Sequence, residues 1–388
     1  MAEPEDDRKI EYVANETGGN ISVQPVYAEG YEIGRGLFVG GVVGYNYGYI
    51  IDHSYNAGSI NVNASRNVNV GGIVGRLSLN NIQNTYNAGA ILITSLLDTQ
   101  YLLIDTSLNV GGIAGIVGEN EQELGNEVML QKLYNEGNIT IVRNNPASGY
   151  GNENHKITFN VGGIIGTGKS TSVIESANMG QVTIDLNYNQ VGYYNNENQY
   201  VNTTTFYIGG VAGNLSEILY WDGTSIEYLS NVANYANIRA ELQARNDAMK
   251  LGGVVGFTYG VDTRNTLFSA NIQFPSLVYP IYYGITGWDG TEPTISSSYF
   301  LSQTINGKNL EMSKEDETKH PGRGSTSSYW LKRQATYTGW DFTNIWSISE
   351  GVNYPWLRNI TLSIDIADGS EAEPTIDLNS LPLAPQSF

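Results

Sequence analysis

The sequence predicts an all-β protein: a right-handed parallel β-helix (solenoid) of about six three-sided coils, with long decorating loops and a C-terminal cap. Three observations lead to this prediction. A glycine-rich hexapeptide recurs along the chain, a Tyr-Asn corner follows its early copies at a fixed interval, and a short strand closes each of the first four units. Repetition of this kind is typical of solenoids, in which each unit buries its apolar face against its neighbours.

The hexapeptide has the form apolar-Gly-Gly-apolar-apolar-Gly. Glycine permits tight corners and lets neighbouring backbones approach closely. The shortest interval between units, from Gly40 to Gly71, is 31 residues, which is enough for one three-sided coil. The copies are Val39–Gly44, Val70–Gly75, Val110–Gly115, Val161–Gly166, Ile208–Gly213 and Leu251–Gly256.

A Tyr-Asn-x-Gly corner follows the first three hexapeptides and is degenerate in the others. Tyr55, Tyr86 and Ala177 each lie 14 residues after the second glycine of their unit, which indicates a rigid segment. Stacked at about 4.8 Å, such Tyr and Asn side chains form ladders along the axis, so we interpret them as structural rather than as ligand contacts. The corners are Tyr55–Gly58, Tyr86–Gly89, Tyr134–Gly137 and Ala177–Gly180, with only Ala233-Asn234 and Ala270-Asn271 in the last two units.

A short strand closes each of the first four units. Most of these segments alternate polar and apolar residues, as a half-buried strand does. Each unit is therefore expected to hold about three strands separated by Gly or Asn corners. The closing segments are Ser59–Val62, Ala90–Ile93, Asn138–Ile141 and Gln181–Ile184.

These units resemble the GLUG repeat of bacterial surface proteins, in which Gly-Gly-apolar-apolar-Gly precedes a Tyr-containing strand and a Gly corner. The resemblance covers roughly residues 38–300, and the segment from Gly339 to Leu357 looks like the unit that often ends such arrays. It implies an extracellular stalk, an adhesin or a non-catalytic region of a surface enzyme, and it brings no catalytic residues.

Four regions are expected along the chain. Residues 1–36 form an N-terminal lead-in or cap, 37–300 the β-helix repeats with their inserts, 301–366 a C-terminal cap region, and 367–388 an acidic, Pro-containing tail. The abrupt acidic start has neither a basic nor an apolar leader segment, which we interpret as the mark of a fragment of a longer secreted chain.

Charge and composition limit the classes of partner that this chain can bind. A formal net charge of −19 disfavours nucleic acid and anionic membrane surfaces, and no stretch is long and apolar enough for membrane insertion. Cysteine is absent, so thiolate metal sites are excluded. We expect an extracellular or cell-surface location, a polysaccharide surface as partner and no cofactor; a structural calcium ion held between inserts is compatible with the sequence.

Aromatic residues gather in inserts that interrupt the repeat, and solenoids usually bind ligands through such loops. The inserts run over about 94–108, 143–158, 185–207 and 274–298, and the motif Trp-Asp-Gly-Thr occurs twice. Exposed Tyr and Trp rings suit the C–H faces of sugar rings, whereas the alternative is that they cover an open side of the helix. The candidate ligand-binding residues are Trp221, Trp288, Tyr193, Tyr194, Tyr282 and Tyr283.

The architecture and composition are also similar to those of the cellulose-binding adhesins called tāpirins, whose C-terminal portion is a decorated β-helix. We therefore expect a non-catalytic adhesin for an insoluble polysaccharide, with cellulose as the first choice. Two alternatives stay open: a β-helical polysaccharide lyase or hydrolase, and a passive stalk of a larger surface protein.

The sequence also contains a match to a nucleotide-binding motif and two pairs of candidate catalytic residues, but their sequence context does not support these functions. Gly163–Ser170 matches a P-loop, yet it overlaps the repeat hexapeptide and continues into an expected strand at Thr171–Ile174 rather than into a helix. Asp52 beside His53, and Asp262 near Arg264, are the nearest catalytic candidates, and neither pair lies in a recognisable pattern.

Overall fold

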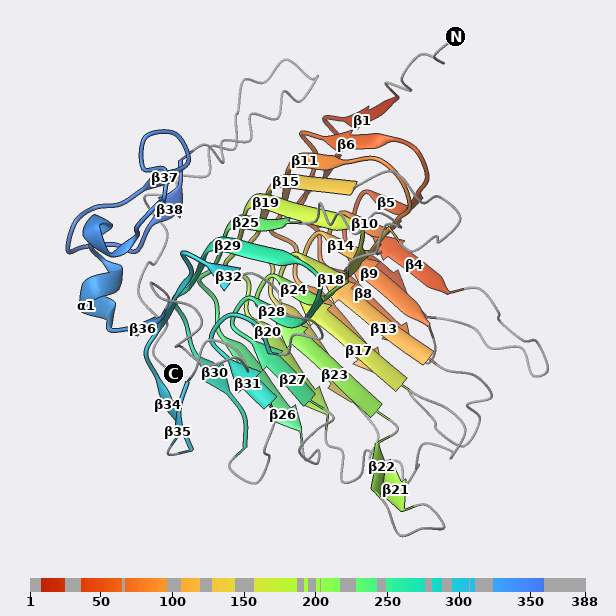
Figure 1. The fold of residues 1–388 in the computed structure, drawn as a ribbon. Coiled ribbons are helices and arrows are strands. Elements are labelled where there is room, and N and C mark those ends of the chain that lie inside the picture. Colours follow the sequence, from red (N-terminus) through yellow and green to blue (C-terminus); the bar gives the residue numbers. More distant parts are fainter. Residues whose placement is uncertain are drawn as a thin grey trace, which may run out of the picture.

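The chain folds as a parallel β-helix, as the sequence predicts (Figure 1). The computed structural model describes residues 8–24, 36–64, 67–95, 106–118, 128–143, 157–186, 192–194, 200–202, 204–216, 228–242, 249–275, 281–287, 295–306, 308–310 and 324–358. Successive coils stack so that each strand pairs in parallel with its equivalents in the coils above and below.

Each coil contributes strands to four parallel sheets, here called A, B, C and D. Sheet A contains β1 (Lys9–Glu11), β6 (Ile50–Asp52), β11 (Ile82–Asn87), β15 (Val128–Asn135), β19 (Thr171–Asn178), β25 (Tyr228–Asn234), β29 (Asp262–Phe268), β33 (Tyr299–Leu301) and β36 (Gly324–Thr326), with β2 (Ala14–Asn15), β7 (Tyr55–Asn56) and β32 (Ile295–Ser296) beside this path. Sheet B contains β3 (Ile21–Val23), β8 (Ile60–Ala64), β12 (Ile91–Ser95), β16 (Ile139–Arg143), β20 (Val182–Leu186), β26 (Ile238–Leu242) and β30 (Ile272–Gln273).

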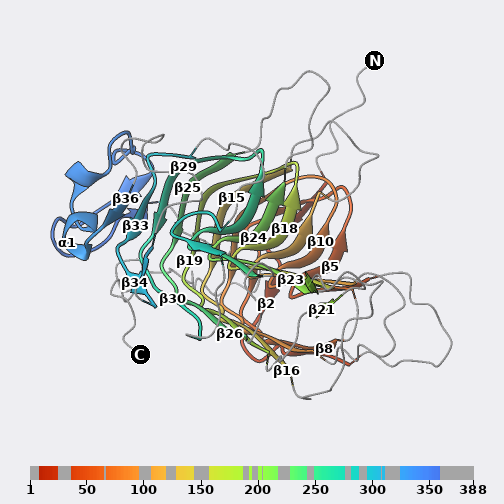
Figure 2. The same cartoon turned by 60° about the horizontal axis from the view of Figure 1, so that its bottom comes forward.

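Sheets C and D are formed by the two halves of the hexapeptide region. Sheet C contains β4 (Leu37–Gly40), β9 (Val68–Gly71), β13 (Thr106–Gly111), β17 (Ile157–Gly162), β23 (Thr204–Gly209), β27 (Met249–Gly252) and β31 (Ile281–Tyr283). Sheet D contains β5 (Val43–Asn46), β10 (Val74–Leu77), β14 (Ala114–Val117), β18 (Ile165–Lys169), β24 (Ala212–Ser216) and β28 (Val255–Tyr259). The Gly-Gly corner thus divides one side of the expected three-sided coil into two short strands (Figure 2).

The remaining elements lie outside these sheets. They are the hairpins β21 (Gly192–Tyr194) with β22 (Tyr200–Asn202) and β34 (Thr304–Ile305) with β35 (Lys308–Asn309), the short helix α1 (Ser328–Leu331), a 3-10 turn at Gln334–Thr336, and the pair β37 (Trp346–Ser347) with β38 (Trp356–Leu357).

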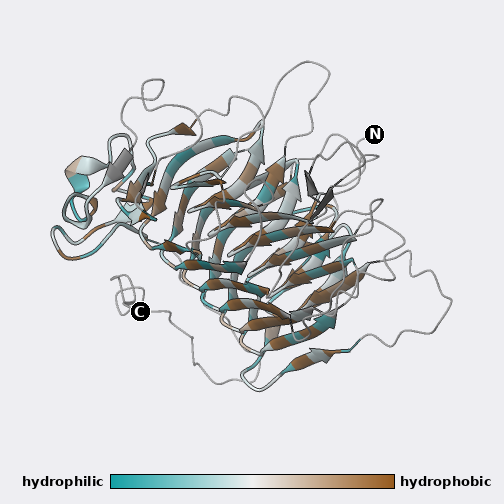
Figure 3. Ribbon diagram, turned by 90° about the horizontal axis from the view of Figure 1, so that it is seen from below, coloured by the Kyte–Doolittle hydropathy of each residue, from teal (hydrophilic) through white to brown (hydrophobic). Residues whose placement is uncertain are grey.

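The core is a column of apolar side chains that repeats from coil to coil. Val70, Val110 and Val161 occupy one register position of sheet C, and all three are fully buried. Colouring by hydropathy shows these apolar positions recurring on successive rungs (Figure 3). Stacking of this kind buries apolar area between every pair of neighbouring coils, which is the main stabilising contribution to such a fold.

The second glycine of each of the first five hexapeptides lies against the ladder Asn of its own unit. A Cβ on Gly112 would lie 2.1 Å from the carbonyl oxygen of Gly163 in the next coil and 2.2 Å from Cγ of Asn135. The same contact pairs Gly72 with Asn87. The contact between this glycine and the ladder Asn is kept even in the third unit, where an insertion lengthens the interval between Gly112 and Asn135.

The buried Asn residues form a continuous hydrogen-bonded ladder. Each amide nitrogen donates to the amide oxygen of the next Asn at 2.7–2.9 Å and, from Asn56 onward, also to the carbonyl oxygen two residues ahead. The members are Asn15, Asn56, Asn87, Asn135, Asn178 and Asn234. This confirms the structural interpretation of the corner residues.

In the sixth unit the register corrects the sequence interpretation. Ala233 and Asn234 pair with Leu267 and Phe268, not with Ala270 and Asn271. Asn271 lies further along, where its backbone N–H donates to the side chain of Asn237. The ladder ends here because Phe268 occupies the Asn position and fills the space over Gly253.

The regular coils begin before the expected boundary at residue 37, and the repeat region contains one more copy of the hexapeptide than expected. β1, β2 and β3, within the expected lead-in, pair in parallel with the first complete coil. At the other end, residues 282–287 follow the sixth hexapeptide in register, with Ile285 fully buried at the position of Val254. A seventh, degenerate copy of the hexapeptide is therefore present. The expected tail at 367–388 lies outside the described residues.

The C-terminal segment packs against the outer face of sheet A (Figure 1). The ladder position held by Tyr134 is occupied by Ala177 and Ala233 in the next two coils, which leaves room for the aromatic rings of the segment. Trp346 donates from Nε1 to Asn231 at 3.2 Å, and Trp340 donates to the backbone of Ser297 at 2.8 Å. The segment thus covers a side of the helix, while β36 adds the last strand to the edge of sheet A.

Candidate functional site

The predicted ligand-binding residues fall into three groups. Trp221 and Trp288 lie outside the described residues. Tyr193 and Tyr194 lie on β21, which pairs antiparallel with β22 in a hairpin outside the coil. Tyr282 and Tyr283 lie on β31, the last strand of sheet C.

The structure corrects the placement of Tyr282 and Tyr283. The sequence assigned both to an insert, but β31 pairs in register with β27, so Tyr282 stands beside Leu251 and Tyr283 beside Gly252. They belong to the seventh copy of the repeat, which is hidden because Tyr283 replaces its first glycine. Both rings are half-buried, and Tyr282 packs against the hydrophobic core.

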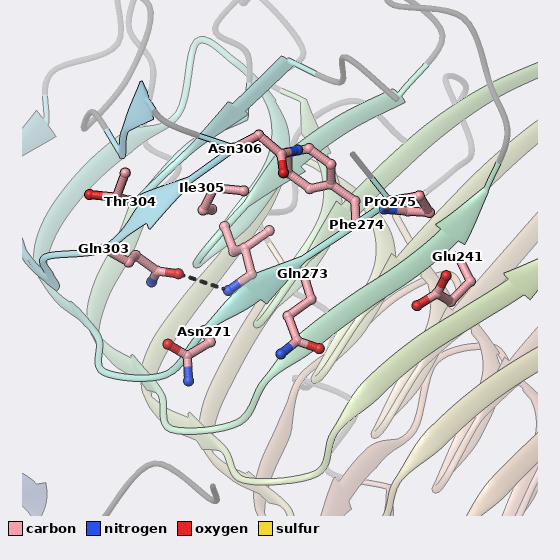
Figure 4. Close-up of a pocket in the computed structure, with 10 residues that line it drawn as sticks. Glu241, Asn271, Gln273, Phe274, Pro275, Gln303, Thr304, Ile305 and Asn306 are labelled. Atoms are coloured by element: carbon pink, nitrogen blue, oxygen red, sulfur yellow. Dashed lines mark hydrogen bonds between the residues drawn. The ribbon is translucent and has the colours of Figure 1, made fainter. Parts of the chain in front are cut away.

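Close to Tyr282, a pocket of about 460 Å³ opens at the end of sheet B (Figure 4). Its walls come from β26, from β30 and the residues after it, and from the β34 turn. The lining residues are Glu241, Asn271, Ile272, Gln273, Phe274, Pro275, Gln303, Thr304, Ile305 and Asn306. The volume lies within the range of small-ligand pockets.

The back of the pocket is closed by Gln303. Its amide oxygen accepts a hydrogen bond from the backbone N–H of Ile272 at 3.1 Å, and its amide nitrogen donates to the carbonyl of Ala270 at 2.8 Å. A further strand of sheet B would form hydrogen bonds with these same backbone groups. The side chain of Gln303 thus takes the place of a backbone strand and ends the sheet, so the pocket lies where the next coil would continue.

The polar wall carries amides available to a ligand. Within the described part of the chain, the side chains of Asn271 and Gln273 make no hydrogen bond, and neither side chain is fully exposed. Glu241 is held by Arg239, whose Nε lies 3.0 Å from the carboxylate. The wall therefore presents amide donors and acceptors and one carboxylate, groups that can form hydrogen bonds with hydroxyl groups.

The apolar wall consists of Phe274 supported by Tyr282. Their ring centroids are 5.0 Å apart at an interplanar angle of 54°, and the Tyr282 hydroxyl donates to the carbonyl of Ile305 at 3.4 Å. Tyr282 therefore fixes two walls of the pocket from behind rather than lining it. The arrangement places an aromatic side chain beside polar hydrogen-bonding groups, which is how sugar rings are commonly bound.

Most of this pocket was missed at the sequence level. Glu241, Asn271 and Gln303 belong to three different turns of the chain, and no local motif joins them. The signal that could have found it is the loss of the repeat after Gln273, because the end of a sheet needs a side chain such as Gln303 to satisfy its edge.

The chemical motifs weighed at the sequence level are explained by the fold. In the P-loop match, Ile165–Lys169 and Thr171–Asn178 are the strands β18 and β19, which confirms that no helix follows. Asp52 is buried and accepts hydrogen bonds from Gln83 at 2.8 Å and Asn84 at 2.9 Å, with Nδ1 of His53 at 2.7 Å. This carboxylate joins neighbouring rungs of sheet A.

Two kinds of feature are absent from the described residues. They contain no cluster of three or more His, Asp or Glu side chains arranged to hold a metal ion. None of their helices has the length and apolar character needed to cross a bilayer.

Comparison with known proteins identifies no relative. No family model matches the chain, and neither a curated protein nor a solved structure matches it.

Proposed function

We propose that this chain is a non-catalytic extracellular adhesin that binds an insoluble polysaccharide, with cellulose as the best candidate. The observation that carries the proposal is the pocket at the end of sheet B, whose lining includes Phe274 and the amides of Asn271 and Gln273, which have no hydrogen-bond partner among the described residues. Trp221 and Trp288 remain part of the proposal as additional sugar contacts on the inserts.

The pocket favours binding over hydrolysis. Most glycoside hydrolases use two carboxylic groups that flank the scissile bond. Glu241 is the single carboxylate among the residues that line the pocket, and Arg239 engages it. Arg264, the basic partner considered for Asp262, donates to Ser230 and lies over the ring of Tyr228 at 4.6 Å. The lyase or hydrolase alternative gains no support from these contacts.

A pull-down on microcrystalline cellulose tests the proposal. We expect the wild-type protein to be retained at both low and high salt, because amides and rings rather than ion pairs make the contacts. Asn271→Ala with Gln273→Ala should reduce the affinity for cellulose about thirtyfold, since each lost hydrogen bond contributes roughly 1 kcal/mol. Trp221→Ala with Trp288→Ala tests the insert residues separately.

Two controls separate the alternatives. Gln334→Ala removes an exposed amide from the C-terminal segment, which does not line the pocket, and should leave retention unchanged. Release of reducing ends or unsaturated sugars during incubation would favour the enzyme. Failure of the wild-type protein to bind cellulose or any other polysaccharide would favour the passive stalk.

A further inference from the structure

A pair of exposed aromatic rings lies on the short helix α1, beyond the last strand of sheet A (Figure 1). The side chains of Tyr329 and Trp330 are 57% and 55% exposed, and their ring centroids are 5.2 Å apart at an interplanar angle of 85°. The other tryptophans of the described residues, Trp340, Trp346 and Trp356, are buried or half-buried. Tyr and Trp are enriched at binding surfaces because each ring combines an apolar face with a polar atom.

The backbone beneath these rings is held in place by the rest of the C-terminal segment. Leu331 is fully buried, and its carbonyl accepts a hydrogen bond from the hydroxyl of Tyr337 at 2.6 Å. The carbonyl of Trp330 accepts hydrogen bonds from the hydroxyl of Thr336 at 2.6 Å and from the backbone N–H of Arg333 at 3.0 Å. The rings are therefore presented from a fixed backbone, which lowers the entropy cost of binding a ligand.

Arg333 lies beside these rings with its guanidinium donors unused. The central carbon of the guanidinium group is 4.4 Å from the ring centroid of Tyr329. Its Nε is buried without a partner, whereas its two Nη atoms are accessible and also form no hydrogen bond or ion pair with the described residues. A guanidinium group whose Nη atoms are free can pair with both oxygens of a carboxylate.

The C-terminal segment is locally positive. Residues 324–358 carry three cations and two carboxylates and so have a net charge of +1, within a chain whose net charge is −19. Both carboxylates already accept hydrogen bonds, Asp341 from two backbone N–H groups and Glu350 from one. At physiological ionic strength the field of distant charges is screened within about 8 Å. An anionic group can therefore approach Arg333 although the chain as a whole is acidic.

We propose that Tyr329, Trp330 and Arg333 form a binding site for a uronic acid residue of an acidic polysaccharide. Such a residue carries an apolar C–H face and a carboxylate on one rigid ring. The C–H face packs on an exposed aromatic ring, and the carboxylate pairs with the Nη atoms of Arg333. This site shares no residue with the pocket at the end of sheet B, so it is independent of the proposed function.

Calorimetric titration with oligogalacturonate tests this inference. We expect binding that weakens with added salt, and an affinity about tenfold lower in Arg333→Gln and in Trp330→Ala, because each variant removes one of the contacts with the sugar. Arg333→Lys should recover only part of the affinity, because an ammonium group cannot pair bidentately. The methyl-esterified oligomer has the same rings without the charge and should bind about tenfold more weakly than oligogalacturonate.

Matched controls make the outcome decisive. Lys332→Gln removes the neighbouring cation, whose ammonium group lies 5.4 Å from the ring centroid of Tyr354, and it should leave uronate affinity unchanged. Asn271→Ala, which alters the pocket, should leave it unchanged as well. The comparison of the charged and esterified oligomers uses the wild-type protein, so it does not depend on how a variant folds.

Four results would overturn the inference. They are equal binding of the esterified oligomer, a loss in Lys332→Gln or Asn271→Ala equal to that in Arg333→Gln, tighter binding of a polyglutamate peptide than of the uronate, and no uronate binding by the wild-type protein.

Discussion

At the scale of single residues, the fold depends on positions where a glycine lies against a buried asparagine side chain. The second glycine of the hexapeptide admits the ladder Asn, and the Asn satisfies backbone carbonyls that face the interior. A further row of residues adopts positive φ of 45° to 55° two positions before the Tyr-Asn corner, and so bends sheet A in each coil. These are Tyr12, His53, Asn84, Lys132, Glu175, Asn231, Asn265 and Ser297.

Removing one ladder Asn should be costly. In Asn87→Ala the amide groups of Asn56 and Asn135 lose their partner while they remain buried. We expect a loss of about 3 kcal/mol in the free energy of unfolding, since each orphaned buried polar group costs about 1–3 kcal/mol. Urea unfolding measures it. Leu92→Ala, on the exposed side of sheet B, is the control, and an equal loss in both variants would contradict the ladder account.

The positive-φ row offers a stabilising substitution. Lys132 has φ of 55°, a conformation that costs most side chains about 1–2 kcal/mol and that Asn tolerates better. Lys132→Asn should therefore raise the free energy of unfolding by up to about 1 kcal/mol, whereas Lys132→Ala should give no such gain. A gain from Ala equal to that from Asn would show that the charge, not the backbone, is responsible.

At the scale of elements, the C-terminal segment is matched to the part of sheet A that it covers. Ala233 is fully buried beneath it, in a row that carries Tyr in earlier coils. Ala233→Tyr restores the ladder residue but overfills this interface. We expect the segment to detach, with rapid tryptic cleavage at Arg333 while the coils stay protected. Ala57→Tyr, outside the interface, is the control. Unchanged resistance of Arg333 would show that the segment does not need this gap.

The tyrosine ladder should make the fold sensitive to alkali. Burial raises the pKa of Tyr55 to about 12, and it raises the pKa of Tyr86 and Tyr134 further; the nearby carboxylates of Glu16 and Glu136 add to these shifts. Because the folded state holds these protons more tightly, their contribution is complete below about pH 10, the pKa of unfolded tyrosine, and is lost as pH rises through the folded values.

Thermal unfolding as a function of pH checks this expectation. The midpoint should be nearly constant between about pH 7 and about pH 9 and should fall steeply above about pH 10. Tyr86→Phe, which carries no phenolic proton, should show a shallower fall than the wild-type protein. A midpoint that stays constant to about pH 12 would show that these tyrosines do not control alkaline stability.

The repeats were predictable, and the pocket was not, for the same physical reason. Stacked coils impose the same environment on equivalent positions, so Gly112 and Asn135 recur as a pattern that the sequence displays. The pocket forms where the repeat ends. Gln303 has no equivalent in an earlier coil, and Tyr282 occupies a position that carries an aliphatic residue in every earlier copy. The sequence predicts about three strands in each unit, whereas the structure has four parallel sheets. The difference arises because the Gly-Gly corner lies within one sequence motif yet separates two strands.

At the scale of the whole molecule, the β-helix is a support that holds the pocket at the end of sheet B. The pocket combines amides, one carboxylate and a ring supported by Tyr282, and we propose that it binds a neutral sugar. The stacked coils fix its position because each coil packs on its neighbours.

The most direct test of the central claim, that the end of sheet B is a polysaccharide-binding site, is hydrogen–deuterium exchange with and without cellohexaose. We predict slower exchange in the segments 271–275 and 303–306, where the ligand would cover the backbone around the pocket, and no change in the central coils of sheet C. Unchanged exchange in both pocket segments at saturating ligand, or protection confined to another part of the chain, would contradict the account.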